Sequence, residues 1–178
     1  MPAPRFADQL NAQIGNELAA HNQYLACAIH YDALTMPQMA RFFYAQALEE
    51  RSHALMMVQY LLDTDAEIVI PAVDAPVNEF ADVVAPVELA LEQENRVTSQ
   101  INELLVIARE ENDFASEQFL QWFIKEQVEE VSSMSDLLTI VRRASGDPLR
   151  AEEWLAREQV GSADDDDPLA PPAAGGSR

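Results

Sequence analysis

Cysteine, glycine and basic residues are all scarce in this chain of 178 residues. Cys27 is the single cysteine, so an intrachain disulfide is impossible, and a zinc or iron–sulfur site built from several thiolates is excluded. There are only 5 glycines, and long stretches contain neither glycine nor proline, which favours long helices over a β architecture. With 48% apolar residues at this length, a single domain with a substantial core is expected.

The shortage of basic residues leaves the chain strongly acidic. The 11 Lys and Arg residues stand against 31 Asp and Glu residues, which gives a formal net charge of −20. Nucleic acid is not expected as a partner, because phosphate binding requires basic patches. The acidic balance suits attraction of cations, although many cytosolic proteins are simply acidic. No apolar run reaches membrane-spanning length, and the N-terminus lacks the apolar segment of a secretion signal, so we expect no membrane and a cytoplasmic location.

Four long helical segments are predicted, over about residues 6–34, 37–63, 86–112 and 113–145. The links within the first pair and within the last pair are short, so each pair should be antiparallel. The stretch from Thr64 to Ala85 contains Pro71 and Pro76 and is too long for a tight turn, which predicts one extended crossover. The fold class is therefore all-α, a four-helix bundle with one long crossover.

The C-terminal part is expected to differ from the bundle. Gly146 is the expected stop of the fourth helix, and a short fifth helix is predicted from Pro148 to about Gln159, with Asp147 as its N-cap. The folded domain is accordingly placed at residues 1–160. Residues 161–178 form an acidic tail rich in Pro, Ala and Gly, which should be disordered in isolation or drape over a neighbouring subunit.

Each long helix places one Glu or Gln in the middle of its apolar stripe, where a leucine would be expected. Burying an unpaired carboxylate is costly enough to threaten the stability of a whole domain, so several such groups in one core need compensation. Two divalent cations would neutralise four carboxylates. Carboxylates with one imidazole suit iron or manganese, with zinc as a competitor. The positions concerned are Glu17, Glu50, Glu94 and Gln127, with His53 and Glu130 one turn after Glu50 and Gln127.

The spacing of these positions repeats between the two halves of the chain. Glu17 precedes Glu50 by 33 residues, and Glu94 precedes Gln127 by the same interval. Two helical hairpins related by a pseudo-two-fold axis would therefore bring all four positions to the same depth. One Glu-x-x-His motif would be weak evidence, because such motifs are common on solvated helices. Four polar positions in register are typical of a di-metal carboxylate bundle.

On these residues the chain resembles the bacterial non-haem ferritins over about residues 6–160. The stretches QALEERSHA at 46–54 and FLQWFIKEQVEEV at 119–131 carry the resemblance. The longer C-terminal tail is similar to that of the mycobacterial-type branch. The resemblance implies a ferritin-like four-helix bundle that oxidises iron(II) with dioxygen at an intrasubunit di-iron centre. It also implies storage of a ferric oxide mineral inside a homo-oligomeric shell of 24 subunits.

The resemblance further implies a ligand set for two irons. One iron would be held by Glu17, Glu50 and His53. The second would be held by Glu50, Glu94 and Glu130, so that Glu50 bridges the pair.

Other residues receive supporting roles from the same resemblance. Gln127 would be a weak partner of the second iron, and Tyr24 would be a hydrogen-bond partner and one-electron donor beside the centre. A third iron site is implied nearby, built from Glu49, Glu126 and Glu129 together with Glu130.

Several expectations separate this chain from relatives or stay open. No haem is expected, because Arg51 stands where bacterioferritins place the haem-ligating Met after the bridging Glu50. His21 either orients a ligand or is a satisfied core or interface histidine. Glu117, with Asp113 and Gln121, either lines a three-fold iron entry channel or belongs to an ordinary solvated first turn.

Two other functions compete with the ferritin interpretation. One is a catalytically silent subunit that only nucleates mineral, although such family members lack the intact centre. The other is a di-metal oxidase or oxygenase related to the small subunit of ribonucleotide reductase. Chains of that kind are longer and carry two Glu-x-x-His motifs, and the size of the assembly would distinguish them from a shell.

Overall fold

The computed structural model describes residues 1–144, 146–158 and 169–175. Within these residues it contains helices and no strand, which confirms the all-α class. The predicted bounds of the second helix match those observed, and the other helices begin or end within about two residues of prediction. None of the described helices combines the length and apolar character needed for a membrane span. The elements are α1 (Pro4–Ala33), α2 (Pro37–Asp63), α3 (Ala85–Glu110), α4 (Phe114–Arg143) and α5 (Leu149–Glu158).

The ends of the long helices follow from local chemistry. Thr35, Asp65 and Asn112 adopt positive φ angles of 60°, 53° and 56° just after α1, α2 and α3, and this left-handed conformation turns the chain away from each helix axis. Asp113 is the N-cap of α4, because its side chain accepts a hydrogen bond from the Ser116 backbone N–H at 3.1 Å. These short links produce the two antiparallel hairpins that the sequence predicted.

The end of α4 differs from prediction. The helix ends at Arg143 with Ala144 as its C-cap. Gly146 has no left-handed φ angle, so its predicted role as a glycine stop is wrong. The chain nevertheless turns here, because the Asp147 N–H donates to the Ala144 carbonyl at 2.7 Å.

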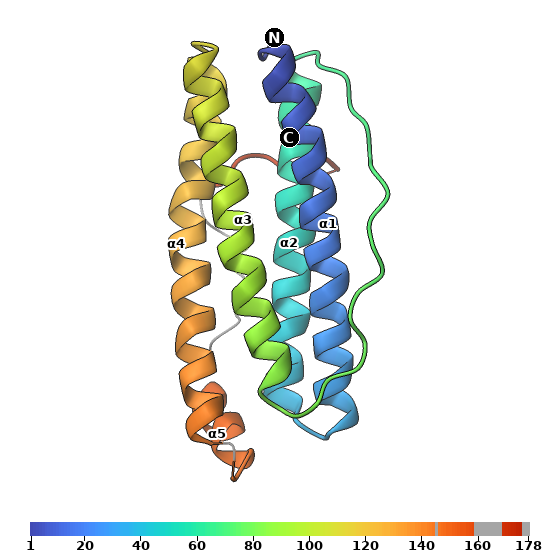
Figure 1. The fold of residues 1–178 in the computed structure, drawn as a ribbon, viewed down its shortest axis with the longest axis vertical. Coiled ribbons are helices and arrows are strands. Elements are labelled where there is room, and N and C mark those ends of the chain that lie inside the picture. Colours follow the sequence, from blue (N-terminus) through green and yellow to red (C-terminus); the bar gives the residue numbers. More distant parts are fainter. Residues whose placement is uncertain (145, 159–168, 176–178) are drawn as a thin grey trace.

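Residues 64–84 form the extended crossover, which runs along the outer side of α1 from the end of α2 to the start of α3 (Figure 1). Side chains of α1 hold it in place. The Gln23 side chain accepts from the Val77 N–H at 2.8 Å and donates to the Val77 carbonyl at 3.0 Å. Gly15 allows the closest approach, since a Cβ atom there would lie 2.4 Å from Pro71 Cγ. The glycine in the middle of a helix is therefore explained by the crossover that passes over it.

Two apolar clusters fill the bundle and leave a polar layer between them. The upper cluster lies where α1 begins, at the top of Figure 1, and the lower cluster lies toward the opposite end of the bundle. The upper cluster includes Phe6, Leu104 and Leu120, and the lower one includes Tyr31 and Phe43. On every long helix the polar position of the stripe lies between residues of the two clusters. The flanking pairs are Ile14 and Tyr24, Ala47 and Ala54, Ala90 and Val97, and Phe123 and Met134. The fold thus places the four polar positions at one depth, as the sequence spacing predicted.

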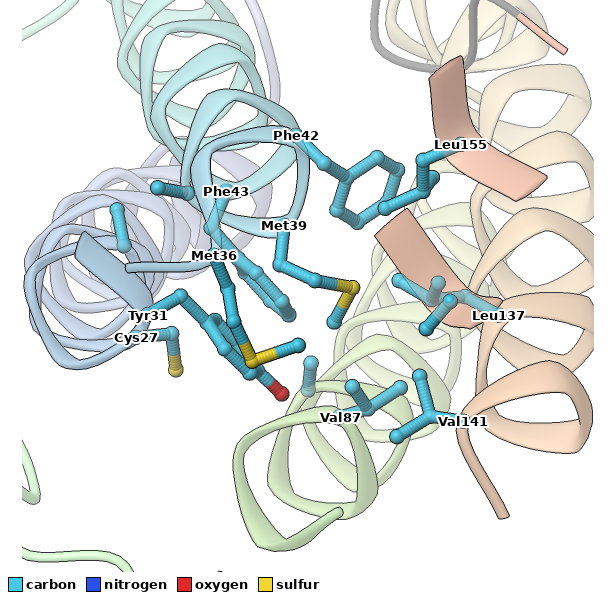
Figure 2. Packing of buried hydrophobic residues seen from close by; sticks show 14 of the residues in the cluster. Cys27, Tyr31, Met36, Met39, Phe42, Phe43, Val87, Leu137, Val141 and Leu155 are labelled. Carbon is cyan, nitrogen blue, oxygen red and sulfur yellow. The ribbon is translucent and has the colours of Figure 1, made fainter. Parts of the chain in front are cut away.

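The lower cluster joins α5 to the bundle. Figure 2 shows Phe42 of α2 pointing toward Leu155 of α5, with Met39 and Leu137 beside them. Cys27 also lies in this cluster and is fully buried, and burial raises the pKa of its thiol to about 12. It is therefore an unreactive, small apolar residue.

A buried carboxylate also fixes α5. Glu152 accepts hydrogen bonds from the backbone N–H groups of Gln38 and Met39, both at 2.8 Å. These are free donors in the first turn of α2, whose own N-cap residue Met36 provides no side-chain cap. Glu152 therefore caps α2 from a helix more than a hundred residues further along the chain, and its charge lies at the positive end of the α2 dipole.

Glu152→Ala should lower the stability of the protein by about 1–2 kcal/mol, because two backbone donors lose their acceptor. Glu153→Ala is the matched control, since Glu153 is the exposed neighbour on the same helix. Thermal unfolding, together with limited proteolysis of the C-terminal segment, would measure the effect. Equal stability of the two variants would show that the cap contributes nothing.

The described part of the tail contacts the bundle of its own chain. The Ala174 N–H donates to the Leu55 carbonyl of α2 at 3.0 Å. Ala170 and Ala173 pack against the upper cluster. The sequence predicted no packing within the chain for these residues, because small and Pro-rich segments bury little apolar area. The contacts of this short segment, residues 169–175, include this backbone hydrogen bond and the packing of small side chains.

Candidate metal centre

The polar layer of the bundle is a cluster of buried acids. Glu17 and Glu50 are each 1% exposed, and Glu94 is fully buried. They come from α1, α2 and α3, and α4 adds Glu130 one turn after Gln127. The four helices therefore direct carboxylates into one buried layer.

Ligand atoms in this layer form two sets that share one residue. Oxygen and nitrogen atoms of Glu17, Glu50 and His53 lie within 4.8 Å of one another, and so do oxygens of Glu50, Glu94 and Glu130. These are the two groups of residues that the family resemblance implied as ligands of two irons, with Glu50 common to both. The structure thus brings together all five residues in the predicted combination.

The hydrogen-bond partners of the carboxylates follow a simple pattern. Glu17 Oε1 accepts from Gln13 Nε2 at 2.8 Å, and Glu94 Oε1 accepts from the Tyr24 hydroxyl. The other oxygen of each, Oε2, is buried without a partner. Glu50 differs, because both of its oxygens are buried without a partner. Since buried acceptors normally have a partner, these oxygens are groups that could hold a cation. Glu50 has two of them, as a bridging ligand requires.

Burial and mutual repulsion shift the titration of the cluster. Burial raises the pKa of Glu17, and burial together with the neighbouring Glu94 raises the pKa of Glu50 well above its ordinary value. Burial raises the pKa of Glu94 to about 7, although hydrogen bonds from Tyr24 and Gln127 oppose the shift. Without a cation, the cluster therefore holds protons at neutral pH.

The burial and packing of His53 favour a neutral imidazole that can act as a metal ligand. Burial lowers the pKa of its imidazole to about 4, so the ring carries no charge at neutral pH. Its Nδ1 lies 3.4 Å from Glu50 Oε2. The ring packs edge-on against Trp122 and Phe123, with centroids 5.5 and 5.8 Å away, which fixes its plane. A neutral, oriented imidazole is the form that binds a divalent metal.

The residues of the predicted third site do not form one group. Among the described residues, Glu126 and Glu130 form a third set of atoms within 4.8 Å with His53 rather than with Glu49 or Glu129. Glu49 accepts a hydrogen bond from Gln46. Glu129 is 55% exposed and pairs with Lys125 at 3.3 Å, one helical turn earlier. The roles of Glu49 and Glu129 in a third site stay a prediction.

His21 and the candidate channel residues have structural partners. His21 Nδ1 lies 2.6 Å from the Ala47 carbonyl, a contact that ties α1 to α2 one turn before Glu50. Arg109 pairs with Glu117 at 2.9 Å, and Asp113 is engaged as the α4 N-cap. Gln121 donates a long hydrogen bond of 3.4 Å to the Glu117 carbonyl. A satisfied interhelix histidine is therefore the better interpretation of His21, and the channel role stays a prediction.

Sequence reasoning missed two residues that touch the cluster. Gln13 is fully buried and presents its N–H to Glu17, and its own side-chain oxygen accepts from Asn16 Nδ2 at 2.9 Å. The Thr98 hydroxyl lies 2.8 Å from Gln127 Oε1. A signal for Gln13 existed, because it lies one helical turn before Glu17 on the same stripe.

Comparison with known proteins agrees with this geometry. A family model described as the ferritin-like domain matches residues 7–144. The ferritin BfrB of Mycolicibacterium smegmatis is 49% identical over 173 residues, which cover 97% of this chain and 94% of that protein. The bacterial non-heme ferritin of Staphylococcus aureus is 34% identical over 147 residues, covering 83% and 89%. The matched family range spans the four long helices and every residue of the acid cluster.

A solved structure of similar fold comes from an archaeon. The open pore ferritin of Archaeoglobus fulgidus superposes with a TM-score of 0.83 at 32% identity, covering 89% of this chain and 97% of that one. The similarity therefore extends over most of both chains.

Proposed function

The chain belongs to the ferritin family of iron-storage proteins, and we propose that it oxidises iron(II) with dioxygen at the acid cluster and stores the ferric product inside a hollow shell of 24 subunits. The observation that carries this proposal is the set of unpartnered carboxylate oxygens around one shared residue. A storage protein without an oxidation centre would have no reason to bury four acids at one depth.

The free oxygens support one arrangement of the substrate irons. Glu17 and His53 hold one iron, Glu94 and Glu130 hold the other, and Glu50 spans both with its two free oxygens. Gln127 faces the second iron as a neutral donor, which makes that position the weaker of the two. Hard carboxylate oxygens with one imidazole suit iron(II).

The charge balance of the site favours release of the iron after it is oxidised. Two iron(II) ions balance the four carboxylates, whereas two iron(III) ions exceed them by two charges. Each iron gives one electron, and together they reduce one dioxygen, with two protons, to hydrogen peroxide. The ferric pair must then recruit hydroxide or oxide and leave toward the mineral. The Tyr24 hydroxyl donates a hydrogen bond to Glu94 and so holds that carboxylate in position for the second iron.

Gln13 should position Glu17 for the first iron. Gln13→Met keeps the shape of the side chain but removes the donor, so Glu17 loses the bond that aims its free oxygen. We expect metal affinity at the first position to fall by about 10-fold to 100-fold. Anaerobic titration with cobalt(II) would measure it, with Gln9→Met, one turn earlier on α1, as control. Unchanged cobalt affinity in Gln13→Met would show that Gln13 does not position Glu17 for metal binding.

Apolar side chains exposed on the single chain support assembly into a shell. Ile29 of α1 and Leu48 of α2 are 59% and 58% exposed, and Ile70 of the crossover is 59% exposed. Exposed apolar side chains of this kind are candidates for burial between subunits. Mass measurement in solution tests the assembly, because a shell of 24 chains of 19.8 kDa differs widely from the dimer expected of a di-metal oxidase.

Stoichiometry tests the di-iron site itself. Anaerobic titration of the apo-protein with iron(II) should reach two tightly bound ions per chain, and His53→Ala should lose the first of them. Binding of a single ion, or none, would contradict the assignment of two sites that share Glu50.

A further inference from the structure

A cavity of about 500 Å³ opens between α3 and α4 on the side of the acid cluster where Gln127 lies. Thr98, Ile101 and Gln127 are among the residues that line it. Gln127 is 5% exposed, so the cavity reaches a residue that is almost completely inside the bundle. The cavity is therefore an approach from the protein surface to the layer that contains the carboxylates.

The side chains of Gln127 and Thr98 lie between this cavity and Glu94. Gln127 Oε1 lies 2.8 Å from the Thr98 hydroxyl, and the same Gln127 side chain hydrogen-bonds to Glu94. Gln127 thus lines the cavity and also contacts a proposed iron ligand. A molecule in the cavity would have to displace the Gln127 side chain to reach the second iron position.

Opening this barrier breaks two hydrogen bonds of Gln127, one with Thr98 and one with Glu94. The Thr98 hydroxyl also lies 2.8 Å from the Glu94 backbone carbonyl, so it keeps an acceptor when Gln127 moves away. The Glu94 carboxylate keeps the hydrogen bond from Tyr24. Gln127 can turn toward the cavity, where polar residues of the rim such as Asn102 and Ser135 are exposed. The free-energy cost of opening is therefore that of exchanging two hydrogen bonds for contacts at the rim.

The lining selects against ions. Ile101, Ile124 and Val131 provide apolar walls, and Asp136 at the rim is the one acid among the lining residues. Iron(II) is strongly hydrated and would find no carboxylate ladder along these walls. A small uncharged molecule loses little on entering such an environment.

We propose that the α3–α4 cavity is the port through which dioxygen reaches the second iron position, with the Gln127–Thr98 pair as its inner barrier. The inference rests on the proposed ferroxidase function and adds the route of the oxidant. Dioxygen enters neutral, accepts two electrons from two iron(II) ions and two protons, and hydrogen peroxide leaves by the same route. Both molecules are small and uncharged, so one port serves both, while iron uses a different path.

Filling the cavity tests the port. Val131→Phe adds a ring to the cavity wall, and Ser133→Phe adds the same ring at an exposed position of α4 that does not line the cavity. The Michaelis constant for dioxygen should rise several-fold in Val131→Phe, while the rate at saturating dioxygen and anaerobic binding of two iron(II) ions per chain stay as in the wild type. Ser133→Phe should leave all three quantities unchanged. If Val131→Phe does not fold, Ser135→Phe fills the same cavity from its rim.

Xenon gives a readout that does not depend on oxidation. Crystals of the wild-type protein under xenon pressure should show xenon in the α3–α4 cavity, and Val131→Phe crystals should not. An unchanged dioxygen Michaelis constant in a variant that has lost the xenon site would overturn the port while leaving the ferroxidase proposal intact. An equal rise in both Phe variants would overturn it too. Failure of the wild type to bind two iron(II) ions would instead overturn the proposed function.

Discussion

Glu50→Ala is expected to slow iron(II) oxidation by about 100-fold or more, because the loss of a shared ligand should exceed the effect of losing a residue that only orients one. Glu50 is common to both sets of ligand atoms and has both oxygens free. Its removal weakens both iron positions at once and removes the group that fixes their separation. Among the described carboxylates of the cluster, Glu50 is the one with both oxygens free of hydrogen bonds.

The same substitution should leave the apo-protein folded and more stable. Burial and the neighbouring acids raise the pKa of Glu50, so its carboxylate is unfavourable in the metal-free core. Removing a buried group of this kind relieves repulsion, and the small cavity left by alanine offsets part of the gain. Glu92→Ala, at an exposed position of α3, is the control for the loss of one acid. Stopped-flow measurement of ferric absorbance would give the rates, and wild-type rates in Glu50→Ala would contradict the bridging role.

Proton release is the second large effect that we expect. Zinc(II), which binds without oxidation, should displace more than one proton per chain from the apo-protein at pH 6, and fewer at pH 8. Burial raises the pKa of Glu94 to about 7, so this carboxyl is largely protonated at pH 6 and must lose its proton to bind a metal. The raised pKa of Glu130, caused by burial and by Glu94, acts in the same direction.

The direction of this pH dependence follows from the number of protons that the apo-protein and the metal-bound protein each hold. The apo cluster keeps protons above the ordinary carboxyl range, so it releases them on metal binding, and the number falls as pH rises through the raised pKa values. His53 adds none, because burial lowers its pKa to about 4 and the ring is already neutral at pH 6. Calorimetry in buffers of different ionisation enthalpy counts the protons. Zero release at pH 6 would mean that the carboxylates are ionised without metal, and release that grows with pH would contradict the direction of the shifts.

The long helices were predictable because their signals are local. Pro37 begins α2, and the apolar stripes repeat every three to four residues across each helix. The register of the acids was predictable for the same reason, since equal spacing in two hairpins places them at equal depth. Glu17, Glu50, His53, Glu94 and Glu130 therefore meet as expected.

Contacts between distant segments were not predictable from one sequence. From the sequence alone, Glu152 is expected to be a surface acid of a short helix. The docking of α5 on the bundle brings it to the first turn of α2. From the sequence alone, Gly15 is expected to destabilise α1. Its role becomes clear only from the close contact of Pro71 in the crossover. The Thr98 hydroxyl likewise becomes informative only when α3 and α4 are packed together. Each of these depends on which surfaces meet, and local periodicity carries no information about that.

The third iron site stays a prediction for a related reason. Glu126 and Glu130 have ligand atoms within 4.8 Å of His53, and Glu129 pairs with Lys125 on the surface. Helical spacing places residues on a face, but it does not say which side chains of other helices they meet.

The most direct test is anaerobic loading of the purified apo-protein with iron(II), followed by exposure to oxygen, with ferric absorbance and iron per chain measured together. Rapid oxidation, followed by a soluble mineral that greatly exceeds two irons per chain, is the result predicted for a ferroxidase that stores its product. Binding of about two irons per chain with no mineral would indicate a di-iron oxidase instead. Absence of iron binding would contradict the assignment of the buried acids as a metal centre.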